Sequence, residues 1–430
     1  MLILQYLLNF FSRLILKKYQ PKIIGITGSV GKTSTKAAIL AVLQNKFRVR
    51  GSIKNYNNEL GVPLTIIGKE SAGKNIFLWT KVFLTALGLV LKKDSTYPEI
   101  LVLEMGADKP GDIRYLTQLA PCQVGVLTAI GPTHLEKFKT LKKVAEEKQI
   151  IIKHLSASGF AVINYDDELV KEVQEKTKGQ IISFGFNDGA DLQASDLKII
   201  QELENGLLAL KGESFKLTYH GSVVPVVLNG IIGQPAVYAA LAGAAVGLVL
   251  GMNLVDILEA LKRIVYPLSR MSILSGIKYT TLIDDSYNAS PRAMELALEV
   301  FKDVQVEPGS RKIAVLGDML ELGSYTEEAH KKIGELLKEA GIDFLVTVGE
   351  RAKIIAERAE ECGYENNQIV KFSKSEDAGL FLQEKLIIGD TVLIKGSQGV
   401  RMDKIVVELM AEPLQAEKLV CRQDKTWQNK

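Results

Sequence analysis

The chain has 430 residues, of which 47% are hydrophobic and 24% are charged. This composition excludes a disordered or fibrous protein and is typical of a soluble α/β protein, and the length predicts two or three domains. The net charge of +3 gives no indication of a nucleic-acid partner. Cys122, Cys362 and Cys421 form no CxxC pair, so neither a disulfide framework nor a structural zinc site is supported, which fits a cytoplasmic protein.

The first element, residues 2–16, is almost entirely apolar and is followed by Lys17 and Lys18. It is short for a membrane span, which needs about 20 residues, and its charges follow the apolar run, unlike those of a signal peptide. A second such stretch occupies residues 76–91. Both stretches fit helices that lie on the inner face of a membrane, and both also fit helices that pack on each other or on the core.

Residues 1–20 are therefore expected to form an apolar helix, and residues 21–267 an ATP-binding domain. In the latter, short apolar runs alternate with helical stretches, which predicts a mostly parallel α/β sheet. The expected strands and helices are Ile23–Thr27, Thr33–Leu43, Ile100–Leu103, Val124–Thr128 and the alanine-rich helix Val237–Val249. Alternation between Leu197 and Leu228, with a turn at Asn205-Gly206, predicts a small antiparallel region.

Residues 268–411 are expected to form a second, Rossmann-like α/β domain. Its candidate strands are Thr281–Ile283, Lys312–Leu316, Phe344–Val348 and Thr391–Lys395. The tail, residues 412–430, is polar and is expected to be loosely held.

The strongest local signal is Gly25-Ile-Thr-Gly28-Ser-Val-Gly31-Lys32-Thr33, between an expected strand and helix. Glycines let backbone N–H groups surround phosphates, while Lys32 reaches the terminal phosphates and Thr33 can bind Mg²⁺. The spacing departs from the usual GxxxxGK[ST], because Ile26 occupies the first glycine position. A chance glycine turn is the alternative, but the strand-loop-helix context favours a nucleotide loop.

Two further residues follow apolar strands at the edge where parallel sheets bind ligands. Glu104 ends one strand, where a carboxylate could hold the metal near Thr33. His134 follows another; alone it could be an ordinary loop histidine.

Seven segments together resemble the Mur ligase family, with its motifs in the same order. They are TGSVGKTSTK (27–36), NYNNELGVPLT (55–65), LEMGADKPGDI (103–113), IGPTHLEKF (130–138), IDDSYNASP (283–291), VLGDMLELG (315–323) and IKGSQGVRM (394–402). Among the branches of the family they look most like the enzyme that adds D-alanyl-D-alanine to the muramoyl-tripeptide precursor of peptidoglycan. The resemblance implies an ATP-dependent amide ligase that works through an acyl phosphate.

The resemblance also implies roles in the first domain. The ATP-binding set is Gly28, Ser29, Val30, Gly31, Lys32, Thr33 and Ser34. Two Mg²⁺ sites are implied, one held by Thr33 and Glu104, the other by His134 and a carbamylated Lys148. Carbamylation would reverse the sign of the Lys148 charge next to Mg²⁺. The alternative for Lys148 is a solvated helix lysine, because Glu146 and Glu147 precede it.

The remaining roles concern the substrates. Arg270, Asp284, Asp285 and Asn288 match family residues near the nucleotide, Arg270 as a catalytic residue together with Lys32, His134 and Lys148. Asn55, Asn57 and Asn58 match the motif that faces the precursor peptide, and Lys395, Ser397 and Arg401 a motif placed near the incoming dipeptide amine.

Two departures from the family keep other functions open. The phosphate loop begins one helix after Met1, so we expect the N-terminal UDP-binding domain of the family to be lacking, and residues 68–98 look like an apolar helical insertion. One alternative is a ligase that joins another amino acid to a different, lipid-linked acceptor. Another is a catalytically inactive nucleotide-binding protein at a membrane surface, although a binding module has no need of the second metal set.

Overall fold

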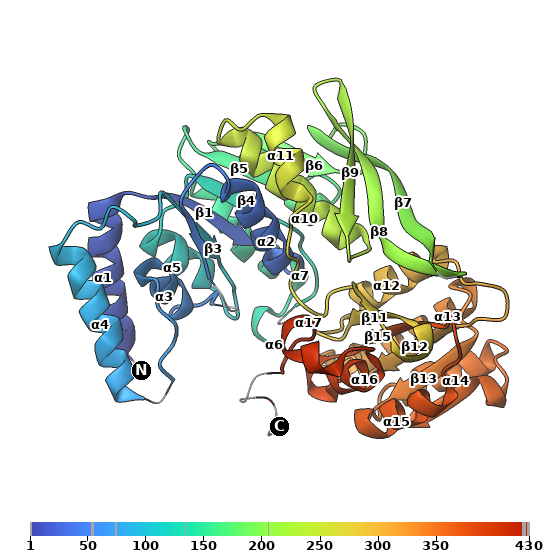
Figure 1. Ribbon diagram of the computed structural model, residues 1–430. Helices are drawn as coiled ribbons and strands as arrows, with labels where there is room; N and C mark the ends of the chain where they lie inside the picture. Colours follow the sequence, from blue (N-terminus) through green and yellow to red (C-terminus); the bar gives the residue numbers. More distant parts are fainter. Residues whose placement is uncertain are drawn as a thin grey trace. The chain divides into compact units, whose positions relative to one another are not determined.

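The computed structural model describes residues 2–52, 56–73, 75–133, 135–204, 206–423 and 427. The chain divides into two compact units, which we describe separately. The first comprises residues 1–196, 215–226 and 235–265; the second comprises residues 197–214, 227–234 and 266–430. The α/β architecture expected from the sequence is confirmed (Figure 1).

The first sheet is built around β1 (Lys22–Thr27), which pairs in parallel with β3 (Ile100–Glu104) and β4 (Val124–Leu127). These three apolar runs are buried along almost their whole length, as expected of strands covered on both faces. The strand order is β2-β3-β1-β4-β5-β6-β7-β8-β9, with an antiparallel part. The other strands are β2 (Val49–Gly51), β5 (Phe160–Asn164), β6 (Gln180–Gly185), β7 (Leu192–Glu204), β8 (Leu207–Tyr219) and β9 (Ser222–Asn229).

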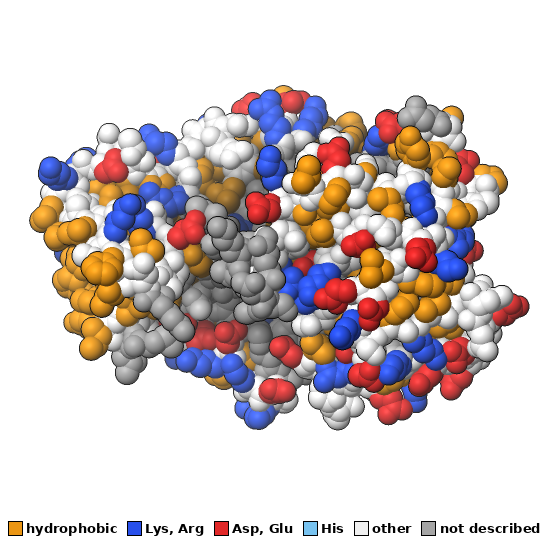
Figure 2. Space-filling view, turned by 60° about the horizontal axis from the view of Figure 1, so that its bottom comes forward, with side chains coloured by type: hydrophobic (Ala, Val, Ile, Leu, Met, Phe, Trp, Pro, Cys, Tyr) orange, Lys and Arg blue, Asp and Glu red, His pale blue; other side chains and the backbone are white. Residues whose placement is uncertain are grey.

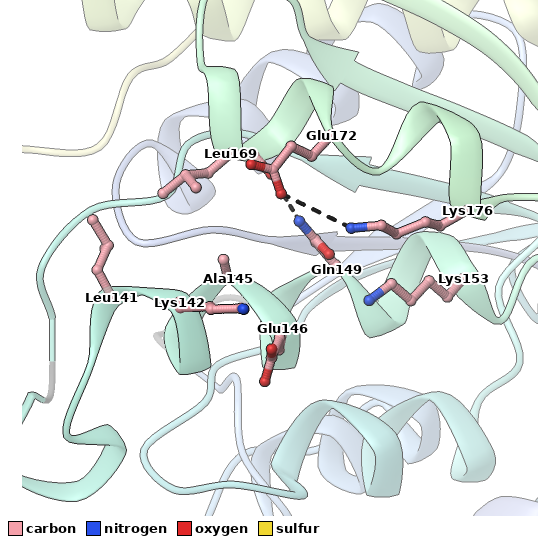
Figure 3. A pocket seen from close by; sticks show the side chains of 9 residues that line it. All are labelled: Leu141, Lys142, Ala145, Glu146, Gln149, Lys153, Leu169, Glu172 and Lys176. Atoms are coloured by element: carbon pink, nitrogen blue, oxygen red, sulfur yellow. Dashed lines mark hydrogen bonds and ion pairs between the residues drawn. The ribbon is translucent and has the colours of Figure 1, made fainter.

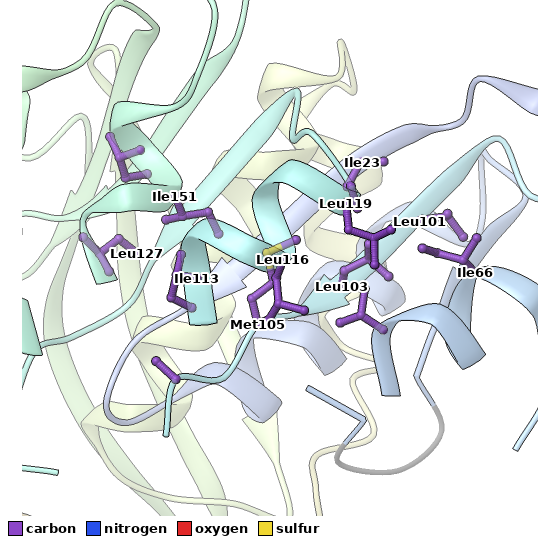
Figure 4. Close-up of a cluster of buried hydrophobic side chains, with 14 of the residues drawn as sticks. Ile23, Ile66, Leu101, Leu103, Met105, Ile113, Leu116, Leu119, Leu127 and Ile151 are labelled. Atoms are coloured by element: carbon purple, nitrogen blue, oxygen red, sulfur yellow. The ribbon is translucent and has the colours of Figure 1, made fainter. Parts of the chain in front are cut away.

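Helices cover both faces of this sheet. On one face α2 (Lys32–Leu43) packs closely on α10 (Gln234–Val249), where a side chain at Gly243 would lie 3.1 Å from Ala38. The other face carries a buried apolar cluster that includes residues of α5 (Asp112–Leu119) and α8 (Ile150–Lys153) (Figure 4). Further helices of this unit are α3 (Gly61–Ile67), α6 (Leu135–Phe138), α7 (Leu141–Lys148), α9 (Glu168–Lys171) and α11 (Leu254–Leu261), with a 3₁₀ turn at Gln174–Lys176.

The two apolar stretches form α1 (Leu2–Tyr19) and α4 (Ile76–Leu91), which lie side by side at one end of the first unit (Figure 1). Phe11 and Phe83 bring their ring centroids within 6.0 Å of each other between the two helices. Leu8 of α1 and Val82 of α4 are buried in the cluster that also includes α5. One side of each helix therefore packs on the domain. Among the helices that the structure describes, none has the length and apolarity needed to cross a membrane.

The sheet of the second unit has the order β10-β11-β15-β12-β13-β14, and only its β10–β11 pair is antiparallel. Its strands are β10 (Ser272–Ser275), β11 (Thr281–Asp285), β12 (Lys312–Gly317), β13 (Phe344–Val348), β14 (Ile369–Phe372) and β15 (Thr391–Lys395). Its helices are α12 (Pro291–Asp303), α13 (Thr326–Glu339), α14 (Lys353–Glu361), α15 (Ser375–Lys385), α16 (Asp403–Leu409) and α17 (Ala416–Leu419), with 3₁₀ turns at Ile277–Tyr279, Gly323–Tyr325, Asn366–Gln368, Gln398–Val400 and Pro413–Gln415. The sequence missed β10 and β14, which are four-residue strands without a continuous buried run.

The tail after residue 412 is better anchored than we expected. It contains α17, and Val420 and Cys421 are buried behind that helix. The Cys421 N–H donates to Ser269 Oγ at 3.0 Å, and the Arg422 guanidinium donates to the Ser286 carbonyl at 3.1 Å. The expectation of a loosely held tail is therefore wrong as far as Arg422, because a short apolar anchor is hidden in a polar segment.

Candidate active site

The loop between β1 and α2 is shaped by two glycines. Gly31 precedes α2 with φ +85°, a left-handed conformation that favours glycine. At Gly28 any side chain would collide with the hydroxyl of Thr128, which follows β4. That hydroxyl instead donates to the Val30 carbonyl at 2.6 Å. The loop is thereby fastened to the end of the neighbouring strand.

A second fastening involves Ser29, whose hydroxyl oxygen accepts the Gly131 N–H at 2.9 Å. Thr133 Oγ1 donates to the same Ser29 oxygen at 3.2 Å. The loop therefore lies directly against the segment that leads to His134, which itself falls outside the described residues. Ser34 lies buried in the first turn of α2.

Two lysines meet at one carbonyl oxygen of this loop. Lys32 Nζ and Lys148 Nζ lie 2.7 Å and 3.0 Å from the Gly28 oxygen. Lys148 is only 3% exposed, so the solvated-lysine alternative is wrong. Burial, reinforced by the Lys32 ammonium, lowers the pKa of Lys148 to about 7. The environment of Lys148 therefore favours the neutral amine over the ammonium, compared with an exposed lysine.

The charged run before Lys148 does not simply face water either. The buried Glu147 carboxylate accepts the N–H groups of Gly111 and Ile113, at 2.9 and 2.8 Å. It thus satisfies backbone donors at the start of α5. This contact fixes α7 against α5 and holds Lys148 on the loop side.

Thr33 and Glu104 lie together, as the sequence predicts for a metal pair. Their side-chain oxygens, Thr33 Oγ1 and Glu104 Oε1, are 3.4 Å apart. Glu104 is 2% exposed and also receives the Asn57 amide at 3.3 Å and the Lys36 ammonium at 3.5 Å. A carboxylate and a hydroxyl beside a phosphate loop are the hard oxygen ligands that Mg²⁺ takes together with substrate phosphates.

Lys36 was not singled out from the sequence. It is 5% exposed and donates to Ser52 Oγ at 2.9 Å, in addition to its contact with Glu104. Its spacing of four residues from Lys32 places both lysines on one side of α2, and this was the available signal. In the part of the chain that the structure describes, no three His, Cys, Asp or Glu side chains form a metal-binding group.

The asparagine motif expected to face the peptide has divided roles. Asn57 contacts Glu104, whereas the Asn58 side chain accepts the N–H groups of Leu60 and Gly61 and so shapes the entry into α3. Asn55 lies outside the described residues.

In the second unit, Asp285 and Asn288, expected near the nucleotide, contact Lys395, expected near the amine. Lys395, 2% exposed, pairs with Asp285 at 2.5 Å and donates to the Asn288 carbonyl at 3.1 Å. Ser397 donates to the Ala289 carbonyl at 3.2 Å. Register explains the pairing, because Asp285 and Lys395 are partners in the parallel β11–β15 ladder.

Asp284 faces the other way along β11. It is fully buried and accepts the Ser269 hydroxyl at 2.6 Å and the Ser286 N–H at 3.0 Å. Burial raises its pKa to about 6. Asp284 therefore braces the loop that carries Arg270.

The two predicted arginines are held differently. The Arg270 guanidinium stacks on the Tyr287 ring at 4.2 Å, and its buried Nε has no hydrogen-bond partner among the described residues. Arg401 pairs with the buried Asp403 at 3.0 Å, and Arg422 approaches the same carboxylate at 3.7 Å. Asp403 and Arg422 were missed by the sequence analysis, because nothing local marks a tail arginine as buried.

A hollow of about 480 Å³ lies beside α7 and α8 (Figure 3). Its lining residues are Leu141, Lys142, Ala145, Glu146, Gln149, Lys153, Leu169, Glu172 and Lys176. Lysines and glutamates dominate its polar lining, and Glu172 pairs with Lys176 at 3.9 Å. None of these residues belongs to the phosphate loop, so the hollow is separate from the site built on Gly28.

Two family models match the parts of the chain that carry these residues. The family model described as the Mur ligase middle domain matches residues 26–78 and 84–247, and that described as the Mur ligase, glutamate ligase domain matches residues 269–398. The chain belongs to the Mur ligase family. The first match contains the Gly28 loop, Glu104 and Lys148, and the second contains Arg270 and the Asp285–Lys395 pair.

Curated Mur ligases are similar over most of the chain. The UDP-N-acetylmuramoyl-tripeptide–D-alanyl-D-alanine ligase of Bacillus subtilis is 30% identical over 95% of this chain and 80% of its own. The same-named ligase of Rickettsia prowazekii is 30% identical over 90% of this chain and 77% of its own.

Solved Mur ligase structures agree. The MurF ligase of Thermotoga maritima in complex with ADP has a TM-score of 0.75 at 28% identity, covering 96% of this chain and 84% of its own. MurF from Acinetobacter baumannii also has a TM-score of 0.75, at 26% identity, covering 93% and 79%.

Proposed function

We propose that this protein is an ATP-dependent ligase that adds D-alanyl-D-alanine to the muramoyl-tripeptide precursor of peptidoglycan. The observation that carries the proposal is the convergence of Lys32, Lys148, Thr33 and Glu104 around the Gly28 loop. The relatives named for this reaction support the choice of substrates.

The reaction has two balanced steps. An oxygen of the precursor carboxylate attacks the γ-phosphorus of ATP, the bond to the β-phosphate oxygen breaks, and ADP and an acyl phosphate result. The dipeptide amine nitrogen then attacks the acyl carbon, phosphate leaves, and the nitrogen loses a proton to give the amide. Lys32 and the N–H groups of the loop stabilise the charge that develops during transfer.

The proposed site would hold two Mg²⁺ ions, which would supply positive charge to the phosphate oxygens. Thr33 and Glu104 would supply oxygen ligands for one ion, and the Lys36 ammonium 3.5 Å from Glu104 supports this role, because the carboxylate already lies beside a positive charge. His134 and Lys148 are proposed for the second. Thr133, next to His134, contacts the loop through Ser29, which supports this assignment.

Lys148 is proposed to act as a carbamate. Its neutral amine adds to the carbon of CO₂, forming an N–C bond and releasing one proton from nitrogen, so that an anionic carbamate replaces the amine. The burial of Lys148 and its pKa of about 7 favour this addition, which requires the unprotonated amine. A carbamate at Lys148 would also place a negative charge beside the Lys32 ammonium, since both side chains reach the Gly28 carbonyl.

For the second unit we propose that Arg270, Asp284, Asp285 and Asn288 serve the nucleotide side, and that Lys395, Ser397 and Arg401 serve the incoming dipeptide. The stacked Arg270 guanidinium keeps a buried Nε available for an acceptor. Because Lys395 and Arg401 are already paired with carboxylates, we propose that they orient neighbouring backbone groups rather than bind the dipeptide carboxylate alone.

The test is phosphate release from ATP with UDP-muramoyl-tripeptide, with and without D-alanyl-D-alanine. We expect release to require both substrates and to fall about 10²–10³-fold in Lys148→Ala, the loss typical of one electrostatic catalytic group. Lys143→Ala, an exposed lysine on the same helix, is the matched control. Added formate should restore part of the Lys148→Ala activity, because it supplies a carboxylate in the space left by the side chain.

Full activity in Lys148→Ala would reject the carbamate, and turnover without the dipeptide would reject the ligase.

We also propose that the protein works at the inner face of a membrane, which it contacts through residues 2–16 and 76–91. The exposed apolar side chains of α1 and α4 support this contact.

A further inference from the structure

The outer surface of the α1–α4 pair is apolar over both helices. Large side chains point outward from each, including Ile3, Tyr6 and Phe10 of α1 and Phe77, Leu84 and Leu91 of α4. Phe77 is 83% exposed and Ile3 79%. Figure 2 shows hydrophobic side chains gathered at the left edge, where Figure 1 places these helices. We call this surface the platform face; a contiguous patch of this kind marks an interaction site.

Polar residues of α1 point the wrong way for a helix that faces water. The side-chain amides of Gln5 and Asn9 both reach the Tyr115 hydroxyl of α5, and Ser12 is fully buried. An amphipathic helix on a water-exposed surface places such residues outward and its aromatic residues inward. Because α1 turns its amides toward the domain and Phe10 away from it, the medium that suits its outer face is apolar.

The C-terminal end of α4 has donors from the protein itself. Lys18 Nζ donates to the Leu89 and Val90 carbonyls at 2.9 and 2.8 Å. The Tyr19 hydroxyl lies 3.0 and 3.1 Å from the Leu89 and Lys92 carbonyls and can donate its single hydrogen to either. Helix-end carbonyls without such donors rely on water. The end of α4 can therefore enter a poorly hydrated environment without leaving these groups unpaired.

The charge of the two helices selects the kind of surface. Neither α1 nor α4 contains an acidic residue, whereas α1 carries Arg13, Lys17 and Lys18 and α4 carries Lys81. Arg13 and Lys17 follow Phe10 at spacings of three and seven residues, which places all three on the same side of α1. Basic side chains therefore lie next to the apolar ones on the platform face. Long basic side chains can extend from an apolar layer to lipid phosphates.

We propose that the platform face binds the surface of an anionic phospholipid membrane, with α1 and α4 lying in its plane. The in-plane orientation follows from packing, because Leu8 and Ile15 of α1 and Val82 and Ala86 of α4 fasten the opposite sides of the helices to the domain. The inference deepens the membrane contact proposed above and needs no ligase chemistry, so each can fail without the other.

The test is flotation of the full chain with vesicles of phosphatidylcholine alone or mixed with phosphatidylglycerol. We expect binding to the anionic vesicles that weakens with salt, and a loss of about tenfold or more in the Phe77→Glu/Leu84→Glu variant. Val255→Glu is the matched control, because Val255 is a 70% exposed apolar residue on α11 of the same unit. Arg13→Glu/Lys81→Glu should weaken binding to anionic vesicles while the apolar face stays intact.

A spectroscopic readout places the helix. The chain has two tryptophans, Trp79 in α4 and Trp427, so Trp427→Phe leaves Trp79 as the single reporter. Its emission should shift to shorter wavelength with anionic vesicles and be quenched by brominated lipid.

The proposal would be overturned if the native chain bound neither kind of vesicle, or if the Phe77→Glu/Leu84→Glu variant bound anionic vesicles as well as the native chain does. A concentration-dependent dimer that this variant abolishes, without vesicle binding, would identify a second copy as the occupant and equally overturn it. Phosphate release with soluble substrates should be unchanged in the variant, which separates a failure of membrane binding from a failure of the ligase.

Discussion

Two lysines, one in each unit, are buried to the same degree but have opposite environments. Lys148 is 3% exposed and contacts a neutral carbonyl beside the Lys32 ammonium, whereas Lys395 is 2% exposed and pairs with the Asp285 carboxylate. The first environment lowers the pKa of its lysine and makes the amine reactive. The second pairs the lysine with a carboxylate on the neighbouring strand and so joins two strands. The partner of a buried lysine, more than its burial, therefore determines whether we expect the amine itself to react, as at Lys148, or to hold neighbouring groups in place, as at Lys395.

The largest difference in stability is expected between two variants in which one of these lysines is replaced by methionine. Lys395→Met should lower the free energy of unfolding by about 3 kcal/mol, because it leaves the largely buried Asp285 carboxylate without its lysine partner. Lys148→Met should leave the stability equal to or above that of the native chain, because it removes a buried amine whose charged form is disfavoured by burial. Denaturant titration of both variants measures the contrast.

Restoring neutrality sharpens this test. The double variant Asp285→Asn/Lys395→Met should recover part of the stability that Lys395→Met loses. Equal losses in Lys148→Met and Lys395→Met would contradict the distinction between the two sites.

A third buried charge extends the comparison to an acid. Glu213 in β8 accepts the Gly233 N–H at 2.7 Å and pairs with no cation in the described part of the chain. Burial raises its pKa to about 7 from the ordinary 4.5. The folded state therefore binds the proton more tightly than the unfolded state, and the stability from Glu213 is present below about pH 4.5 and lost as the pH rises through about 7.

Between about pH 4.5 and pH values above about 7, the contribution of Glu213 to the free energy of unfolding should fall by about 3 kcal/mol. Glu213→Gln has no proton to lose, so its melting temperature should fall less with rising pH than that of the native chain. Thermal unfolding across this pH range, with exposed Glu259→Gln as the control, measures the difference. Parallel pH profiles for both chains would show that Glu213 is not the titrating group.

The smallest effect concerns the fastening of the phosphate loop. Thr128→Val keeps the shape of the side chain and removes the hydroxyl that donates to the Val30 carbonyl, which should cost about 1 kcal/mol. Because the bond holds the loop, we expect a weaker affinity for ATP with little change in overall stability. Calorimetric titration with ATP measures this, and an unchanged affinity would show that the loop keeps its shape without Thr128.

Much of the first unit could be predicted, because its signals are local. The apolar runs of β1, β3 and β4 and the glycines at 28 and 31 each determine their own stretch of chain. The α/β fold and the family were predicted and are confirmed. The roles of the individual site residues stay proposals, although Thr33 and Glu104 do lie together.

What escaped prediction depends on contacts between distant residues. The Asp285–Lys395 pair joins residues 110 positions apart through strand register, which a single sequence does not display. The same reason hid Lys36 beside Glu104 and Arg422 beside Asp403. The inward amides of α1 could not be assigned either, because apolar residues occur all around that helix.

The anchoring of the tail bears on how the chain is made. Ser269, near the start of the main segment of the second unit, receives the Cys421 N–H, and Arg422 holds the backbone after β11. During synthesis these contacts must wait until residue 422 has left the ribosome, long after the first unit has emerged. We therefore expect the two units to acquire their structures in order, with the second completing its fold only once residues 421 and 422 are available.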